Sequence, residues 1–185
     1  CSHITFVGKG KTQTTILGGF NVTNQQNVTF EELTFTSRRE MGLVLTGSSV
    51  DVLKCIVKEC NGTGMFVHNG ATVTATQCEF MKNGGHGVSC FDANTEVRLN
   101  DSTMHHNGMD GLLAYGRAVV ELHGTKTGIL SNKRVGISAG ARAKVNIHLP
   151  SQHNTSHGNV AEDRYQFDGG SIANINADGT FTHVV

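Results

Sequence analysis

A repeat with a period of about 22 to 25 residues runs through most of this 185-residue chain. Runs typical of β-strands begin at valines spaced at nearly equal intervals: Val28, Val50, Val73, Val97, Val120 and Val145. Glycines at matching intervals each precede an alternating run: Gly42, Gly64, Gly87, Gly111 and Gly136. A repeat of this length holds about three short strands and too little chain for an ordinary helix with its connections. The period therefore predicts an all-β solenoid of stacked coils.

Asparagine recurs three or four residues before four of these glycines, at Asn61, Asn83, Asn107 and Asn132. Asparagine tolerates the left-handed backbone of a sharp corner, and its amide can hydrogen-bond locally. We therefore expect these residues to occupy corners and their amides to form a ladder from coil to coil.

The two-residue period of a strand predicts which side chains point inward. On sheet-forming runs these are Val28, Phe30, Val50, Val52, Val73, Val97 and Leu99. Two further inward columns are predicted, one of Leu33, Cys55, Cys78, Ser102 and Thr125, and one of Phe35, Val57, Phe80 and Met104.

This repeat resembles that of the pectin-lyase-like superfamily, whose coils often carry a phrase like Asn83-Gly84-Gly85-His86-Gly87-Val88. The resemblance covers residues 4–149, with Ile4–Gly10 and Thr14–Phe20 similar to the first coil of that superfamily. It implies a right-handed single-stranded parallel β-helix of about six to seven coils over residues 1–150. Residues 151–185 break the period, so we expect an irregular C-terminal cap or tail that packs on the end or side of the helix.

Charge and hydropathy exclude several classes of partner. Lys plus Arg and Asp plus Glu each number 15, so no basic face for nucleic acid is predicted. No window approaches the length of apolar sequence that spans a membrane, and no leader peptide is visible. Because the chain begins at Cys1 without Met, we expect it to be part of a longer or processed protein. The Gly8–Thr12 stretch lacks the first glycine of a phosphate loop, so no nucleotide cofactor is expected.

Five cysteines without a Cys-x-x-Cys pair favour free thiols, and Cys55 over Cys78 is predicted to be a stacked pair rather than a disulfide. Free thiols favour a reducing intracellular compartment or a virus particle over secretion. The alternative is a glycosylated surface protein, because Asn21, Asn27, Asn61, Asn100 and Asn154 each begin an Asn-x-Ser/Thr sequon.

The phrase Gly85-His86-Gly87 resembles the Gly-His-Gly motif of polygalacturonase-like glycosidases, which implies a catalytic role for His86 beside Asp110. Glycoside hydrolysis needs two carboxyl groups, and the place one coil earlier reads Asn61-Gly62-Thr63-Gly64. The acidic clusters of calcium-dependent lyases and the Asp-Pro-His phrase of epimerases are also missing. We therefore expect no catalytic site, with a carbohydrate-active enzyme on acidic polysaccharide (lyase, epimerase or glycosidase) as the alternative.

Histidines offer a weak metal hypothesis. His86, His105 and His106 lie near one corner, while His123 and His148 fall one repeat apart on one outward column. Neither set has a regular spacing or a matching Cys, so no dedicated metal site is predicted.

An outward apolar column is the feature most typical of a binding surface. Positions two and four residues beyond the glycines place five side chains on one flat face: Phe66, His68, Phe91, Leu113 and Tyr115. We call these five residues the outward stripe. A contiguous apolar patch usually marks an interaction, here with a protein, a glycan or a second copy, unless the C-terminal tail covers it. The sequence thus favours a non-catalytic recognition or assembly module, of the kind found in viral or cell-surface structural elements and in protein- or glycan-binding domains.

Overall fold

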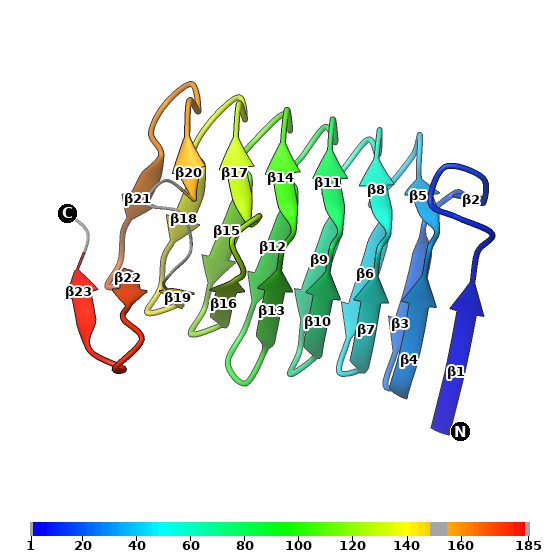
Figure 1. Ribbon diagram of the computed structural model, residues 1–185, viewed down its shortest axis with the longest axis horizontal. Coiled ribbons are helices and arrows are strands. Elements are labelled where there is room, and N and C mark those ends of the chain that lie inside the picture. Colours follow the sequence, from blue (N-terminus) through cyan, green and yellow to red (C-terminus); the bar gives the residue numbers. More distant parts are fainter. Residues whose placement is uncertain (1, 149–154, 184–185) are drawn as a thin grey trace.

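The computed structural model describes residues 2–148 and 155–183, and within them every regular element is a β-strand. The chain winds into an elongated rod, with its N-terminus at one end and its C-terminus at the other (Figure 1). Seven successive coils contain three short strands each, and equivalent strands of neighbouring coils pair in parallel. In this described part no helix is long and apolar enough to cross a membrane.

Three sheets run along the rod, and we name them A, B and C in the order in which each coil passes through them. Sheet A consists of β1 (Ser2–Val7), β4 (Gln26–Glu31), β7 (Ser49–Leu53), β10 (Thr72–Thr76), β13 (Glu96–Asn100), β16 (Val119–His123), β19 (Lys144–His148), β22 (Ser171–Ile175) and β23 (Phe181–His183). Sheet B consists of β2 (Thr15–Leu17), β5 (Thr34–Thr36), β8 (Ile56–Lys58), β11 (Glu79–Met81), β14 (Thr103–His105), β17 (Gly128–Leu130) and β20 (Ser156–His157). Sheet C consists of β3 (Phe20–Thr23), β6 (Leu43–Thr46), β9 (Met65–His68), β12 (Val88–Phe91), β15 (Leu112–Tyr115), β18 (Ile137–Ala139) and β21 (Arg164–Gln166).

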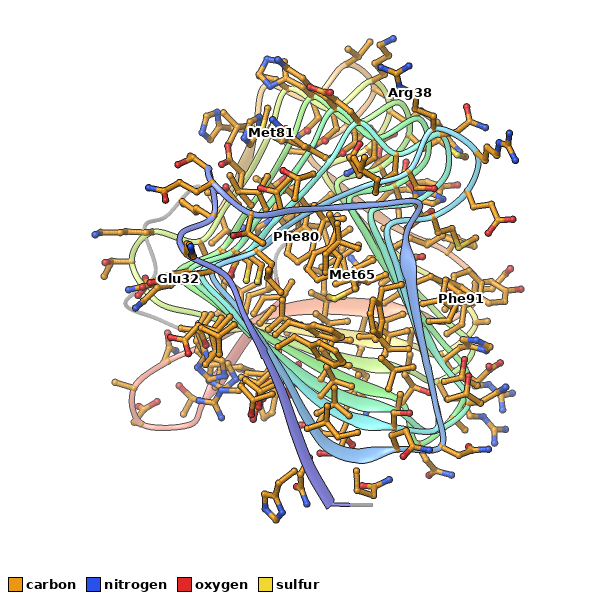
Figure 2. All side chains as sticks on the ribbon, turned by 90° about the vertical axis from the view of Figure 1, so that its right-hand side faces the viewer. Glu32, Arg38, Met65, Phe80, Met81 and Phe91 are labelled. Carbon is orange, nitrogen blue, oxygen red and sulfur yellow. The ribbon has the colours of Figure 1, made fainter. Side chains whose placement is uncertain are left out.

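The periodic valines set the register of sheet A. Val28 pairs with Val50, Val50 with Val73, and the pairing continues through every valine of the series to Val145. The predicted inward residues of this sheet are all buried. Viewed along the rod, Met65 and Phe80 lie inside, whereas Phe91 lies on the outer surface (Figure 2). Like side chains therefore stack on like through one continuous core.

The corner between sheets B and C differs in detail from the prediction. The left-handed residues are Glu59, Lys82, His106 and Ser131, each immediately before a buried residue, and not the asparagines themselves. The left-handed residue turns the chain, and the next side chain then points into the rod. Asparagine is therefore selected here for its amide and not for its backbone freedom.

The asparagine ladder is confirmed, but it includes Asn159 and does not include Asn61. The side-chain Oδ1 atoms of Asn83, Asn107, Asn132 and Asn159 each accept a backbone N–H from the preceding coil, at 3.0–3.1 Å. Each Nδ2 of the first three also donates to the Oδ1 of the next asparagine. The prediction for Asn61 was wrong: Asn61 is exposed, and Cys60 occupies the ladder position. Asn61 precedes its glycine by three residues and the others by four, and that spacing was the available signal.

The periodic glycines are explained by the same ladder. A Cβ atom at Gly87 would lie 2.7 Å from the carbonyl oxygen of Gly111 and 2.8 Å from Nδ2 of Asn107. At Gly64 the corresponding contacts, with Gly87 and Asn83, would both be 2.6 Å. Separations this short exclude a side chain, so glycine lets neighbouring coils approach closely at this corner.

The predicted inward columns of sheet B are confirmed except at one position. Phe35, Val57, Phe80 and Met104 are fully buried, as is Ile129 in the next coil. The prediction for Thr125 was wrong, since Thr125 is exposed and Thr127 is buried at this place. Thr127 accepts the Ser102 N–H at 3.4 Å, whereas an added loop around Gly124 carries Thr125 outward.

The segment after residue 150 is more regular than an irregular cap, although residues 149–154 lie outside the described part. Strands β20, β21 and β22 pair in parallel with β17, β18 and β19 and so extend all three sheets. Among the described strands, β23 alone runs antiparallel, against β22. The repeat is hard to read here because 27 residues separate Asn132 from Asn159 and Asp163 stands where earlier coils have glycine. The division of the chain at residue 150 stays a prediction.

The cysteines of the described coils behave as small apolar side chains. Cys55, Cys60, Cys78 and Cys90 are buried free thiols, which confirms that Cys55 and Cys78 form no disulfide. Burial raises the pKa of Cys78 and of Cys90 to about 12, and it also raises the pKa of Cys55 and Cys60. These groups therefore remain thiols near neutral pH and make poor nucleophiles. Cys1 lies outside the described residues.

Candidate functional site

Sheet C places the outward stripe on one face of the rod. Strands β9, β12 and β15 each begin with a buried residue, so the second and fourth side chains point away from the core. Parallel register aligns these outward positions: Phe66 pairs with Ser89 and Ser89 with Leu113, while Phe91 pairs with Tyr115. The five residues predicted from the glycine spacing thus lie on the same face.

The rings of this face touch one another in sequence along the rod. Ring centroids are 4.6 Å apart for Phe66 and His68, 5.4 Å for Phe66 and Phe91, and 5.7 Å for Phe91 and Tyr115. These separations fall within the range of about 4.5 to 7 Å that is favourable for aromatic pairs. His68 also contacts Thr46, with 2.8 Å between Nε2 and Oγ1. The contacts hold the rings in place without a partner.

Small residues alternate with the large ones and leave room for the rings. Ser89 and Ser138 face outward, yet each is only 2% exposed because larger neighbours cover them. A Cβ atom at Gly140 would collide with the ring of Phe167, so this glycine leaves the space that the ring occupies. The face is therefore a packed apolar layer on the outside of sheet C.

The C-terminal segment lengthens this layer. Phe167 lies 6.1 Å from Tyr115 and 5.4 Å from Tyr165, measured between ring centroids. Tyr115 and Tyr165 are 37% and 46% exposed, so the described part of the tail extends the stripe without covering it. The rings of Tyr165 and Phe167 were not predicted as part of the stripe, because Tyr165-Gln166-Phe167 was assigned to a cap. The alternation of these three residues was a usable signal.

The weak catalytic pair, His86 and Asp110, meets at the corner before sheet C. His86 Nδ1 is 3.6 Å from Asp110 Oδ2 and accepts the Asp110 backbone N–H at 3.3 Å. Asp110 Oδ1 accepts the Val135 N–H at 3.2 Å and lies 3.8 Å from Nε of Arg134. Thr63 stands in the coil before and brings no carboxylate. The pair thus ties three coils together and lacks the second carboxyl group of a glycosidase.

The environment of His86 predicts a dependence of stability on pH. Burial lowers the pKa of His86 below 6.5, and Arg134 lowers it further against the opposing effect of Asp110. As the pH falls below 6.5, His86 takes up a proton in the unfolded chain before it does so in the folded chain. The free energy of unfolding therefore decreases as the pH falls. We expect the free energy of unfolding in urea to drop less from about pH 7 to about pH 5 in His86→Gln than in the unmodified protein. An identical drop in both would contradict this assignment.

The histidines of the metal hypothesis occupy three places, and the first is that of His86 beside Asp110. His105 and His106 are 2.8 Å apart through their Nδ1 atoms, and His105 Nε2 lies 2.8 Å from Glu79 Oε1. His123 and His148 do share one outward column, on sheet A, and their rings stack at 3.9 Å. Burial and the neighbouring His148 lower the pKa of His123.

Stacked coils, three parallel sheets and an asparagine ladder together define a parallel β-helix with an apolar layer on one outer face. Comparison with known families agrees with this class: a family model described as "Right handed beta helix region" matches residues 15–155. The chain belongs to this family, and its coils are right-handed. No curated protein and no solved structure matches the chain.

Proposed function

We propose that the chain is a non-catalytic β-helical recognition module that binds an extended glycan along the outward stripe. The observation that carries this proposal is the continuous row of rings on sheet C, from Phe66 through Phe91 and Tyr115 to Phe167 and Tyr165. Tyr115 and Tyr165 are exposed, and the phenylalanines of this row are half-buried. A contiguous row of apolar side chains at the surface is typical of an interaction surface.

The shape of the layer supports a narrow ligand over a broad protein interface. Outward positions on these strands are two residues apart, so the layer is about 7 Å wide between its two rows. A stable protein interface buries about 800 Å² on each partner, which asks for a wider surface. A single polysaccharide chain laid along the rod needs only a narrow track. Tyr115 and Tyr165 are exposed and combine an apolar ring with a hydroxyl group, which suits a sugar ring.

The alternative, an enzyme that acts on acidic polysaccharide, would use His86 and Asp110. Asp110 is 3% exposed, and its carboxylate is already engaged by the Val135 N–H, His86 and Arg134. A general acid or base has to reach a substrate atom. This arrangement favours a structural role for the pair.

The binding test uses Phe91→Ser with Tyr115→Ser on a glycan array, followed by titration with the best ligand. Loss of two rings from the centre of the layer removes much of the buried apolar area, so affinity should fall at least about tenfold. Folding should persist because both side chains lie outside the core. Val160→Ser, which changes a 77% exposed side chain in the connection between β20 and β21, is the matched control and should bind normally.

Other outcomes distinguish the remaining functions. Unchanged glycan binding in the double variant, or no binding by the parent protein, would reject the glycan proposal. Concentration-dependent dimers in ultracentrifugation that the double variant abolishes would instead assign the stripe to self-association. Release of reducing ends from polygalacturonate, pectate or alginate that disappears in His86→Gln would establish the enzyme alternative.

A further inference from the structure

Sheet A carries a second polar cluster, separate from the stripe on sheet C. Glu121 and His123 are two residues apart on β16, so both point away from the core. Leu122 of β16 pairs with Ile147 of β19, and the histidines that follow them, His123 and His148, lie beside each other. All three side chains are half-buried. Coil stacking thus brings two imidazoles and one carboxylate together from strands one repeat apart in the chain.

The ligating atoms of this cluster lie close together. One nitrogen or oxygen atom from each of Glu121, His123 and His148 lies within 4.8 Å of the other two. The two imidazole rings stack with centroids 3.9 Å apart and planes 12° from parallel. His148 Nε2 is 2.5 Å from Glu121 Oε2.

Neighbouring residues orient the carboxylate and bound the cluster. Asn146 Nδ2 donates to Glu121 Oε1 at 2.8 Å, which leaves Oε2 directed at His148. One coil later, Ala173 and Ile175 are buried and form an apolar wall. One coil earlier, the Arg98 guanidinium turns to Asn100, with Nε 3.4 Å from Oδ1. A second residue that positions a ligand carboxylate is a usual component of protein metal sites.

We propose that Glu121, His123 and His148 form a binding site for a divalent transition-metal ion such as Zn²⁺. Two imidazole nitrogens and one carboxylate oxygen are a ligand set that zinc accepts, and they leave a fourth position open. Calcium and magnesium prefer oxygen ligands, so this set selects against them. Because a bound ion lies close to the plane of each ligating imidazole ring, one of the two stacked rings turns when the ion binds. The ion then replaces the hydrogen bond between Glu121 and His148. The site is independent of the proposed glycan binding.

The experiment titrates Zn²⁺ into the untagged chain by isothermal calorimetry and repeats the titration with Ca²⁺. We expect one Zn²⁺ ion per chain, an increase in the midpoint of thermal unfolding, and no heat from Ca²⁺. Cobalt(II) should give the visible absorption of a four-coordinate site. His148→Asn and Glu121→Gln should each weaken Zn²⁺ binding by about 100-fold, and Asn146→Leu, which removes the positioning group, by about 10-fold.

His157→Asn is the matched control, because His157 is exposed on sheet B and lies outside the cluster. It should bind one ion with unchanged affinity. Circular dichroism and the melting curve without metal verify that each variant is folded; if His148→Asn does not fold, His123→Asn takes its place. Failure of the parent to bind Zn²⁺, or equal binding by the parent and the His148 or His123 variant, would overturn the site.

Discussion

Asn107→Ala is expected to lower the free energy of unfolding by about 3 kcal/mol, since each buried polar group left without a partner costs about 1 to 3 kcal/mol. Asn107 is 0% exposed and joins three coils. Its Oδ1 accepts the Asn83 N–H at 3.1 Å, and its Nδ2 donates to the Phe80 carbonyl at 3.1 Å. Alanine supplies neither group, so the Asn83 N–H loses its partner inside the rod and the Phe80 carbonyl loses the bond from the amide. Equilibrium unfolding in urea measures the effect.

Asn61→Ala is the control for this prediction. Asn61 belongs to the same periodic series but is exposed, so its replacement should change stability by no more than about 0.5 kcal/mol. Similar losses from the two variants would mean that the residue type at the corner matters more than the buried ladder. Little or no loss from Asn107→Ala would show that the ladder contributes nothing to stability.

Gly87→Val should destabilise the rod still more, by about 4 kcal/mol, or should prevent folding, because overpacking at a rigid backbone contact exceeds the usual cost of about 1 to 3 kcal/mol. The added Cβ would meet the Gly111 carbonyl oxygen at 2.7 Å and the Asn107 amide at 2.8 Å. Neither atom can move without separating two coils or breaking the ladder. Yield of folded protein and urea unfolding report the result.

Gly128→Ala provides the contrast. Gly128 lies in β17, where a Cβ atom would meet only the Leu130 side chain at 3.5 Å, an ordinary contact. Alanine in a strand has less conformational freedom to lose than glycine, so stability should stay constant or rise by about 0.5 kcal/mol. Normal stability of Gly87→Val would refute the close approach of coils at this corner.

The sequence was sufficient to predict the class of fold and most of the core. A strand has only two faces, so once Val28, Val50 and Val73 are aligned, the neighbouring residues are assigned to inside or outside. The positions of residues at corners are harder to predict, because one or two extra residues move a side chain from the core to solvent. Asn61 and Thr125 failed for this reason, and Cys60 and Thr127 took the buried positions.

The C-terminal coil was obscured by changes that the fold accepts easily. A longer sequence separation between Asn132 and Asn159 and Asp163 in place of a glycine remove the periodic signals, while the strand pairing of β21 and β22 continues. Spacing was enough to place the outward stripe, since that depends on alternation alone. Contacts that depend on rotamers, such as the ring of Phe167 over Gly140 or the approach of Glu121 to His148, need coordinates.

The nearly constant sequence separation between paired strands also affects the rate of folding. Each strand of the regular coils pairs with a partner one repeat away in the chain, for example Val28 with Val50 and Val120 with Val145. The entropy of closing a loop rises only with the logarithm of its length, so every added coil meets nearly the same closure cost. Parallel sheets usually fold slowly because their partners are remote in sequence. Here growth from any formed pair of coils proceeds by equal steps, and the rate of propagation is independent of the length already built.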